Sequence, residues 1–226
     1  MSPKNGRRER VFSKMKKASA KINGWDAAYR ERPQQFVEPD TVCTLLDTLF
    51  PKYHIEHILD LGCGNGRHLL YFEKSGHRMV GSDLSRWGLL AARQWLYQEK
   101  QDARLAQADM QHLPFADGCF DAIISFRVIQ HNLYADIQQT FQEIRRVVRS
   151  EGLLVMDLLK YNPQSERFKD AVLAEPNTYI PQSGTEKGMP HHAFTTTEVF
   201  QLLHGWRIKF FDTQGDEKHF TIIAQK

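Results

Sequence analysis

The chain has 226 residues, of which 41% are hydrophobic and 25% charged, and this composition is typical of one folded domain with a buried core. It has no run of about 18 apolar residues, which argues against a membrane-spanning helix, and we expect no secretory signal. The cysteines Cys43, Cys63 and Cys119 form no C-x-x-C pair, so we expect neither disulfides nor a cysteine zinc site, and a cytoplasmic location.

Positive charge is concentrated at the N-terminus. Residues 1–23 contain eight Lys or Arg residues and one Glu, whereas the rest contains 22 basic and 26 acidic residues. Residues 1–23 could form a solvated, flexible arm, contact RNA or phosphate groups, or act as an Arg-rich targeting segment. We expect a basic arm over 1–23 and one folded domain over 24–226.

The middle of the chain alternates short apolar runs with helical periodicity. A helix is expected over 39–51, and further helices over 66–75, 85–98 and 133–149. Five buried strands are expected over 57–62, 79–83, 104–109, 120–126 and 152–159. This alternation predicts β-α-β units, and therefore a Rossmann-like, doubly wound α/β fold.

The pattern changes after the fifth strand. Residues 160–195 are rich in Pro, Asn, Ser and Gly, and we expect a helix over 164–175 within an otherwise irregular lid or substrate loop. A short helix over 196–204 follows, and then two strands joined around Gly215-Asp216 form an antiparallel hairpin.

The most informative segment is the turn after the first strand, Asp60-Leu-Gly62-Cys63-Gly64-Asn-Gly66-Arg67. Glycines allow a tight turn and a close approach by a ligand, and the following helix offers free amides at its N-terminus. Alone, these glycines could form an ordinary tight turn. Asp83 and Asp109 end the next two predicted strands, where the carboxyl ends of parallel strands form a ligand crevice. Each could cap a helix instead, but their coincidence favours a nucleoside site.

The details of the turn favour one kind of nucleoside ligand. A dinucleotide-binding G-x-G-x-x-G motif would place its third glycine at position 67, which is Arg67. Asp60 directly before the turn would repel a pyrophosphate but favour an ammonium or sulfonium group. S-adenosylmethionine (SAM) fits these requirements better than a nicotinamide dinucleotide.

Several motifs in order resemble the signatures of class I SAM-dependent methyltransferases. They are the glycine turn, Gly81-Ser-Asp83-Leu-Ser85, Ala108-Asp-Met110-Gln-His-Leu-Pro114, Phe120-Asp-Ala-Ile-Ile-Ser125 and Arg149-Ser-Glu-Gly152. The resemblance covers about residues 57–159. It implies a seven-stranded sheet of order 3-2-1-4-5-7-6, mostly parallel with a C-terminal antiparallel hairpin.

The resemblance also implies roles for residues of the cofactor site. Asp60 and the loop with Gly62, Cys63 and Gly64 would surround the methionine part, and Asp83 would bind ribose. Leu84 and Met110 would flank adenine, Asp109 would bind its amine, and the backbone near Ser125 and Phe126 would meet the amino group. Arg67 and Ser85 are also expected at the cofactor. Trp25-Asp-Ala-Ala-Tyr29 is similar to a W-x-x-x-Y element that covers the cofactor in small-molecule methyltransferases; Tyr29 could equally be ordinary packing.

The methyl acceptor is expected beside the loop after the fourth strand. His131 is the candidate general base because its usual pKa lies near neutrality; it could instead be structural, cap the next helix or contact the substrate. Some methyltransferases carry a metal-binding E-x-x-E-H here. Arg127 and Gln130 replace both carboxylates, so we expect no metal. Arg127 could attract an anionic substrate or form a surface ion pair.

The lid supplies further substrate candidates, Tyr179, His191 and His192. Adjacent residues point in different directions, so at most one of the two histidines should reach the acceptor, and both could lie on the surface.

The sequence thus predicts a SAM-dependent methyltransferase that acts on a small molecule. The alternatives are an RNA (tRNA) methyltransferase that uses residues 1–23, a non-catalytic SAM-binding protein and a dinucleotide oxidoreductase. The acceptor and the oligomeric state do not follow from the sequence.

Overall fold

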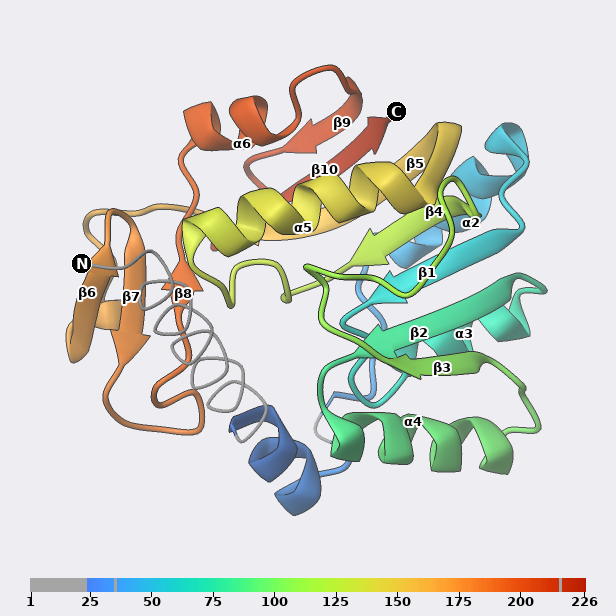
Figure 1. Cartoon of the computed structure of the whole chain (residues 1–226), viewed down its shortest axis with the longest axis horizontal. Helices are drawn as coiled ribbons and strands as arrows, with labels where there is room; N and C mark the ends of the chain where they lie inside the picture. Colours follow the sequence, from blue (N-terminus) through green and yellow to red (C-terminus); the bar gives the residue numbers. More distant parts are fainter. Residues whose placement is uncertain (1–23, 35, 216) are drawn as a thin grey trace, which may run out of the picture.

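The computed structural model describes residues 24–34, 36–215 and 217–226, so the predicted arm lies outside the described residues. Its main sheet contains β1 (His57–Leu61), β2 (Arg78–Asp83), β3 (Arg104–Gln107), β4 (Phe120–Ser125), β5 (Val148–Leu159), β9 (Arg207–Asp212) and β10 (His219–Gln225). The strand order is β3-β2-β1-β4-β5-β10-β9, with β1 to β5 parallel and β10 antiparallel to both neighbours (Figure 1). This confirms the predicted order, since β9 and β10 are the sixth and seventh strands of this sheet.

Helices cover both faces of the sheet, and each face has its own apolar cluster. The helices are α2 (Cys43–Leu49), α3 (Arg67–Lys74), α4 (Arg86–Gln98), α5 (Tyr134–Val147) and α6 (Thr196–Leu202). Side chains alternate along the strands: Leu154 and Met156 of β5 pack with α5 and α6, whereas Leu153 and Val155 pack with α2, α3 and α4. Both faces are therefore buried, which explains the continuous apolar runs in the sequence. A further helical segment spans 24–31.

The segment between β5 and α6 differs from the prediction. The helix expected over 164–175 is wrong, because only a 3₁₀ turn, Glu166–Phe168, forms there. Strands β6 (Ala171–Glu175), β7 (Thr178–Pro181) and β8 (His191–His192) form a separate antiparallel sheet, which we call the small sheet. The reason is local: Pro176-Asn177, with Asn177 at φ +59°, turns the chain between Glu175 and Thr178 and makes a hairpin.

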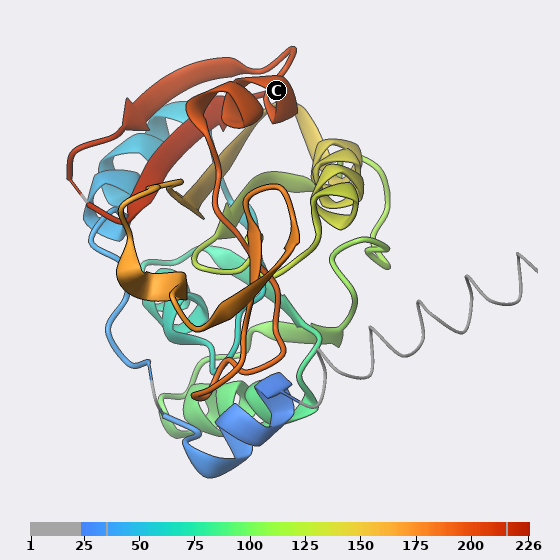
Figure 2. The same cartoon turned by 90° about the vertical axis from the view of Figure 1, so that its left-hand side faces the viewer.

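The small sheet lies beyond the carboxyl ends of the parallel strands, and Figure 2 views the molecule from that side. Both ends of the inserted segment are held together. The Phe194 amide donates to the Leu159 carbonyl (2.7 Å), and the Tyr161 amide donates to the Phe194 carbonyl (2.8 Å). The insertion thus leaves and re-enters the main fold at one place. Among the described residues, no helix is both long and apolar enough to cross a bilayer.

Candidate functional site

The glycine turn forms a tight loop between β1 and α3. Gly62 and Gly64 have φ of +78° and +52°, in the left-handed region that favours glycine. A Cβ on Gly62 would overlap the side chain of Val128, and one on Gly64 would overlap the Tyr29 hydroxyl. The Gly62 and Cys63 amides both donate to the Ser82 carbonyl, at 2.7 and 3.0 Å. The loop is therefore fixed against β2 and leaves no room for a side chain at positions 62 and 64.

Asp83 at the end of β2 is fixed by the same loop. One carboxylate oxygen accepts from the Gly64 amide (2.8 Å) and the other from the Ser85 amide (2.7 Å). Burial raises the pKa of Asp83. Ser85 caps α4 by accepting from the Gly88 amide (3.1 Å), and its hydroxyl donates to Asp26 (2.6 Å), so its side chain faces away from the loop.

Asp60, directly before the loop, is a buried acid without full pairing. It is 1% exposed, its Oδ2 has no hydrogen-bond partner, and burial raises its pKa to about 7. His68 Nδ1 lies 3.9 Å from that oxygen. Because His68 Nε2 accepts from the Asp40 amide (3.1 Å), Nδ1 carries the proton and points a donor toward Asp60. Burial lowers the pKa of His68, so the ring is neutral. Asp60 is thus suited to receive a cationic group.

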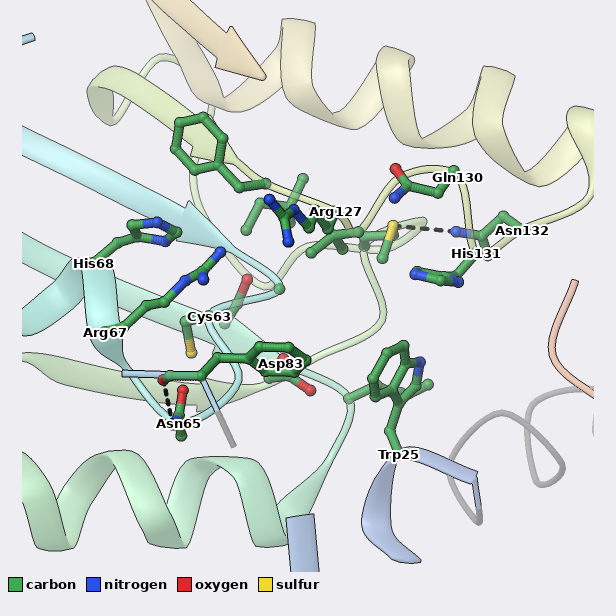
Figure 3. A pocket seen from close by; sticks show the side chains of 18 of the residues that line it. Trp25, Cys63, Asn65, Arg67, His68, Asp83, Arg127, Gln130, His131 and Asn132 are labelled. Carbon is green, nitrogen blue, oxygen red and sulfur yellow. Dashed lines mark hydrogen bonds between the residues drawn. The ribbon is translucent and has the colours of Figure 1, made fainter. Parts of the chain in front are cut away.

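A cavity of about 660 Å³ connects this loop with the loop after β4, a size typical of small-molecule sites. Most of the predicted site residues line it: Tyr29, Gly62, Cys63, Arg67, Asp83, Leu84, Asp109, Met110, Phe126, Arg127 and His131. Asp60, Gly64, Ser85 and Ser125 do not; Ser125 is buried and its hydroxyl donates to the Leu61 carbonyl (3.0 Å). Figure 3 shows Arg67 and His68 on one side and Gln130, His131 and Asn132 on the other.

Arg127 stands at the start of the loop after β4, with φ +62°. Its amide donates to the Asp157 carboxylate, and its Nε lies 3.8 Å from the same group. Asp157 is 4% exposed, and burial raises its pKa to about 7. An ion pair with a buried acid therefore orients the half-exposed Arg127 side chain at the cavity wall.

His131 occupies the other end of that loop. Its ring packs edge-on against Trp25 (5.1 Å between centroids) and His191 (4.5 Å). Burial lowers its pKa, and the nearby His191 and Arg167 lower it further. The ring is therefore neutral near pH 7. Helix α5 begins after Leu133 without a side-chain cap, so His131 does not cap it.

The lid candidates lie in the small sheet, and none of them lines the cavity. Tyr179 stacks on Phe168, with ring centroids 4.6 Å apart. The two histidines face different ways, as expected from their adjacency in a strand. His191 contacts His131, whereas His192 Nδ1 is 2.7 Å from the Thr178 hydroxyl and its Nε2 is 3.6 Å from Glu198.

Sequence reasoning missed several residues at the cavity, notably Asn65, His68, Arg167 and Glu186. Asn65 lies within the glycine motif, and its amide donates to the Phe36 carbonyl (2.7 Å), which holds the segment after the first helix over the loop. His68 follows the motif directly and could have been found there. Arg167 and Glu186 come from the insertion, whose path no local pattern reveals.

Comparisons with known proteins agree with this geometry. The methyltransferase domain family matches residues 59–156. YqeM of Bacillus subtilis, a predicted methyltransferase, is 32% identical over 172 residues, which cover 73% of this chain and 68% of YqeM. The 18S rRNA (guanine-N(7))-methyltransferase bud23 of Schizosaccharomyces pombe is 32% identical over 139 residues, 57% of this chain and about half (48%) of bud23.

A solved structure shares the fold. The 1,6-didemethyltoxoflavin-N1-methyltransferase of Burkholderia thailandensis, with bound 1,6-didemethyltoxoflavin and S-adenosylhomocysteine, superposes with a TM-score of 0.69. The superposition covers 92% of this chain and 88% of that one, at 15% identity. At that identity the likeness concerns the fold.

Proposed function

Because the chain belongs to the class I SAM-dependent methyltransferases, we propose that it transfers the methyl group of SAM to an oxygen, nitrogen or sulfur atom of a small molecule. The observation that carries the proposal is the continuous cavity, which joins the glycine loop to His131. A donor at the loop and an acceptor at His131 would lie in one enclosure, as in-line transfer requires.

The residues around the glycine loop suit SAM. Asp60 does not line the cavity, but its buried carboxylate has an unpaired oxygen and would attract the ammonium group of the methionine part through its negative charge. Gly62 and Cys63 would border that part, and Asp83 would accept from the ribose hydroxyls. Leu84 and Met110 line the cavity beyond Asp83 and would flank adenine, with Asp109 near its amine. Tyr29, packed against the loop, would cover the cofactor.

The chain's own contribution is positioning and exclusion of water. Bound SAM supplies a methyl group that is already activated by its sulfonium, so no strong base is required. Trp25 and Phe126 provide apolar wall, and Arg127 offers a fixed positive charge to an anionic part of the acceptor. His131 presents a neutral ring. To act as a general base, His131 would need a ring nitrogen whose lone pair is free to accept a proton from the acceptor.

An RNA acceptor is the second candidate, favoured by the likeness to bud23 and by the basic residues 1–23. Removal of residues 1–23 should then abolish RNA binding while S-adenosylhomocysteine still binds. Unchanged RNA affinity would count against this candidate.

The cytoplasmic location stays a prediction from the cysteine pattern.

The test has two stages. Calorimetric titration of ligand-stripped protein with S-adenosylhomocysteine should give saturable heat, and Asp83→Ala should weaken binding at least about 100-fold, or about 3 kcal/mol. Asp117→Ala, which changes an acid on the surface, is the matched control and should bind normally.

Incubation with methyl-labelled SAM and cell extract, fractionated into metabolites, RNA and protein, should then place the label in metabolites. Label confined to RNA would replace the small-molecule proposal with the second candidate. Absence of heat with S-adenosylhomocysteine would remove both.

A further inference from the structure

Three potential metal ligands meet beside the acceptor end of the cavity. They are His131 from the loop after β4, Glu186 from the connection between β7 and β8, and His191 from β8. One ligand atom from each lies within 4.8 Å of the other two. His191 Nε2 is 3.5 Å from the Glu186 carboxylate. Residues far apart in the chain therefore converge on one point.

Three of the four ring nitrogens of the two imidazoles in this cluster lack hydrogen-bond partners. His131 Nδ1 and both ring nitrogens of His191 are buried without one, although His191 is fully buried and His131 is 9% exposed. Leaving a buried polar atom unsatisfied costs about 1–3 kcal/mol, so such atoms usually bind a protein group, a water molecule or an ion. His68 and His77 differ, because His68 Nε2 accepts from the Asp40 amide and His77 Nδ1 lies 3.1 Å from the Ile55 carbonyl. His192 Nε2 also lacks a hydrogen-bond partner, but it lies 3.6 Å from Glu198.

We propose that His131, Glu186 and His191 bind a divalent transition-metal ion of the Zn²⁺ type. Two imidazole nitrogens and one carboxylate suit such ions, whereas Mg²⁺ and Ca²⁺ prefer oxygen ligands throughout. Tetrahedral bonds of about 2.0–2.2 Å place ligand atoms roughly 3.4 Å apart, so the cluster closes on the ion by small side-chain movements. His131 is then a ligand and not the general base.

This assignment revises the expectation of no metal. That expectation concerned a site of oxygen ligands after the fourth strand, where Arg127 and Gln130 stand in place of carboxylates. The present cluster takes only His131 from that loop and the other two ligands from the insertion.

The charges around the cluster decide whether a cation is tolerated. Arg167 opposes the ion, since its guanidinium lies 3.8 Å from Glu186. A carboxylate has two oxygens, and one can face Arg167 while the other binds the ion.

Three protein ligands leave a fourth position open. Both His131 and Glu186 line the cavity, so that position faces the space where the acceptor is expected. If the proposed function holds, the acceptor is a small molecule whose thiol, hydroxyl or amine group binds the ion at this open position. Metal binding itself does not depend on that function.

The experiment measures binding of the metal alone to the full chain after treatment with a chelator. Titration with Zn²⁺ should show one saturable site, and Co²⁺ should produce the visible absorption bands of tetrahedral coordination. His131→Ala and Glu186→Gln should each weaken Zn²⁺ binding at least about tenfold, the order of loss expected when metal-site residues are changed. His204→Ala, an exposed histidine outside the cluster, should bind as wild type.

Thermal unfolding shows whether the variants are folded. Zn²⁺ should raise the melting temperature of wild type and of His204→Ala by more than that of Glu186→Gln. Equal Zn²⁺ affinity in wild type and Glu186→Gln would overturn the metal site, and so would the absence of Co²⁺ bands. Binding of S-adenosylhomocysteine, measured in parallel, tests the proposed function separately: its loss in wild type would refute that function and leave the metal result standing.

Discussion

The two ends of the cavity are built in different ways. At the glycine loop, the amides of Gly62, Cys63 and Gly64 bond to the Ser82 carbonyl and to Asp83, so the backbone itself shapes the site. At the small sheet, His131 and His191 meet without hydrogen-bond partners for three buried ring nitrogens. The comparison teaches that the glycine-loop end is preorganised by backbone hydrogen bonds, whereas the other end contains buried polar atoms that the proposed metal ion would satisfy.

The largest expected effect comes from a comparison of two glycines with the same φ. Gly62 and Gly184 both have φ +78°, but a Cβ on Gly62 would overlap Val128, whereas one on Gly184 would meet nothing within 4 Å. Gly62→Ala should weaken S-adenosylhomocysteine binding at least about 100-fold and lower the unfolding free energy by about 2–4 kcal/mol. Titration calorimetry and denaturant unfolding measure the two effects.

Gly184→Ala isolates backbone strain from the steric overlap. It should cost only the left-handed penalty of about 1–2 kcal/mol and leave S-adenosylhomocysteine affinity unchanged. Equal losses of affinity in both variants would show that the close approach at Gly62 is unimportant.

The second test concerns Asp60, the unpaired acid at the cofactor end. A carboxyl whose pKa is raised to about 7 holds its proton more tightly in the folded state. Its stabilisation is complete below the unfolded pKa of about 4 and is lost as the pH rises through about 7. Between pH 5 and pH 8, wild type should therefore lose about 2–3 kcal/mol more unfolding free energy than Asp60→Asn.

Denaturant unfolding of cofactor-free protein at both pH values gives this difference. Asp157, whose pKa is also about 7, contributes to the pH dependence that Asp60→Asn retains. Parallel pH profiles for wild type and Asp60→Asn would contradict a raised pKa for the buried acid at position 60.

The smallest effect is expected where the small sheet joins the main fold. Glu175 accepts from the Tyr134 amide (2.6 Å) at the start of α5 and from the Thr178 hydroxyl (3.2 Å). Glu175→Ala should lower the unfolding free energy by about 1–2 kcal/mol, because a carboxylate at a helix N-terminus and its hydrogen bonds are lost. Glu166→Ala, on the surface of the same insertion, should change it by less than about 0.5 kcal/mol.

S-adenosylhomocysteine affinity should be unchanged in both variants, because neither residue lines the cavity. A loss of that affinity in Glu175→Ala would mean that the two ends of the cavity are coupled.

What the sequence predicts follows the same division. The parallel strands, the helices between them and the glycine loop were predicted because each depends on local patterns: apolar runs, helical periodicity and turn glycines. Asp83 was correctly placed beside the loop because parallel strands end at one edge of a sheet. Ser85 was expected at the cofactor, but it does not line the cavity. Its hydroxyl donates to Asp26, a residue far away in the sequence, so its orientation could not be predicted from the local motif.

The acceptor end could not be predicted in the same way. The small sheet has short strands whose pairing depends on the Pro176-Asn177 turn, and a helix was expected in their place. Glu186 and His191 acquire significance only when the folded insertion brings them to His131. Their meeting is a property of the tertiary structure, and nothing in the spacing of the three residues indicates it.

The closure of the insertion at Leu159, Tyr161 and Phe194 has an evolutionary consequence. The two ends of the insertion are hydrogen-bonded to each other. The segment between them can therefore be exchanged as a unit, because only two neighbouring positions connect it to the main fold. Residues 161–193 can thus change in sequence without altering the register of β5 and β10, which pair outside this segment. Under the proposed function, such a change would alter the acceptor site and leave the glycine loop as it is.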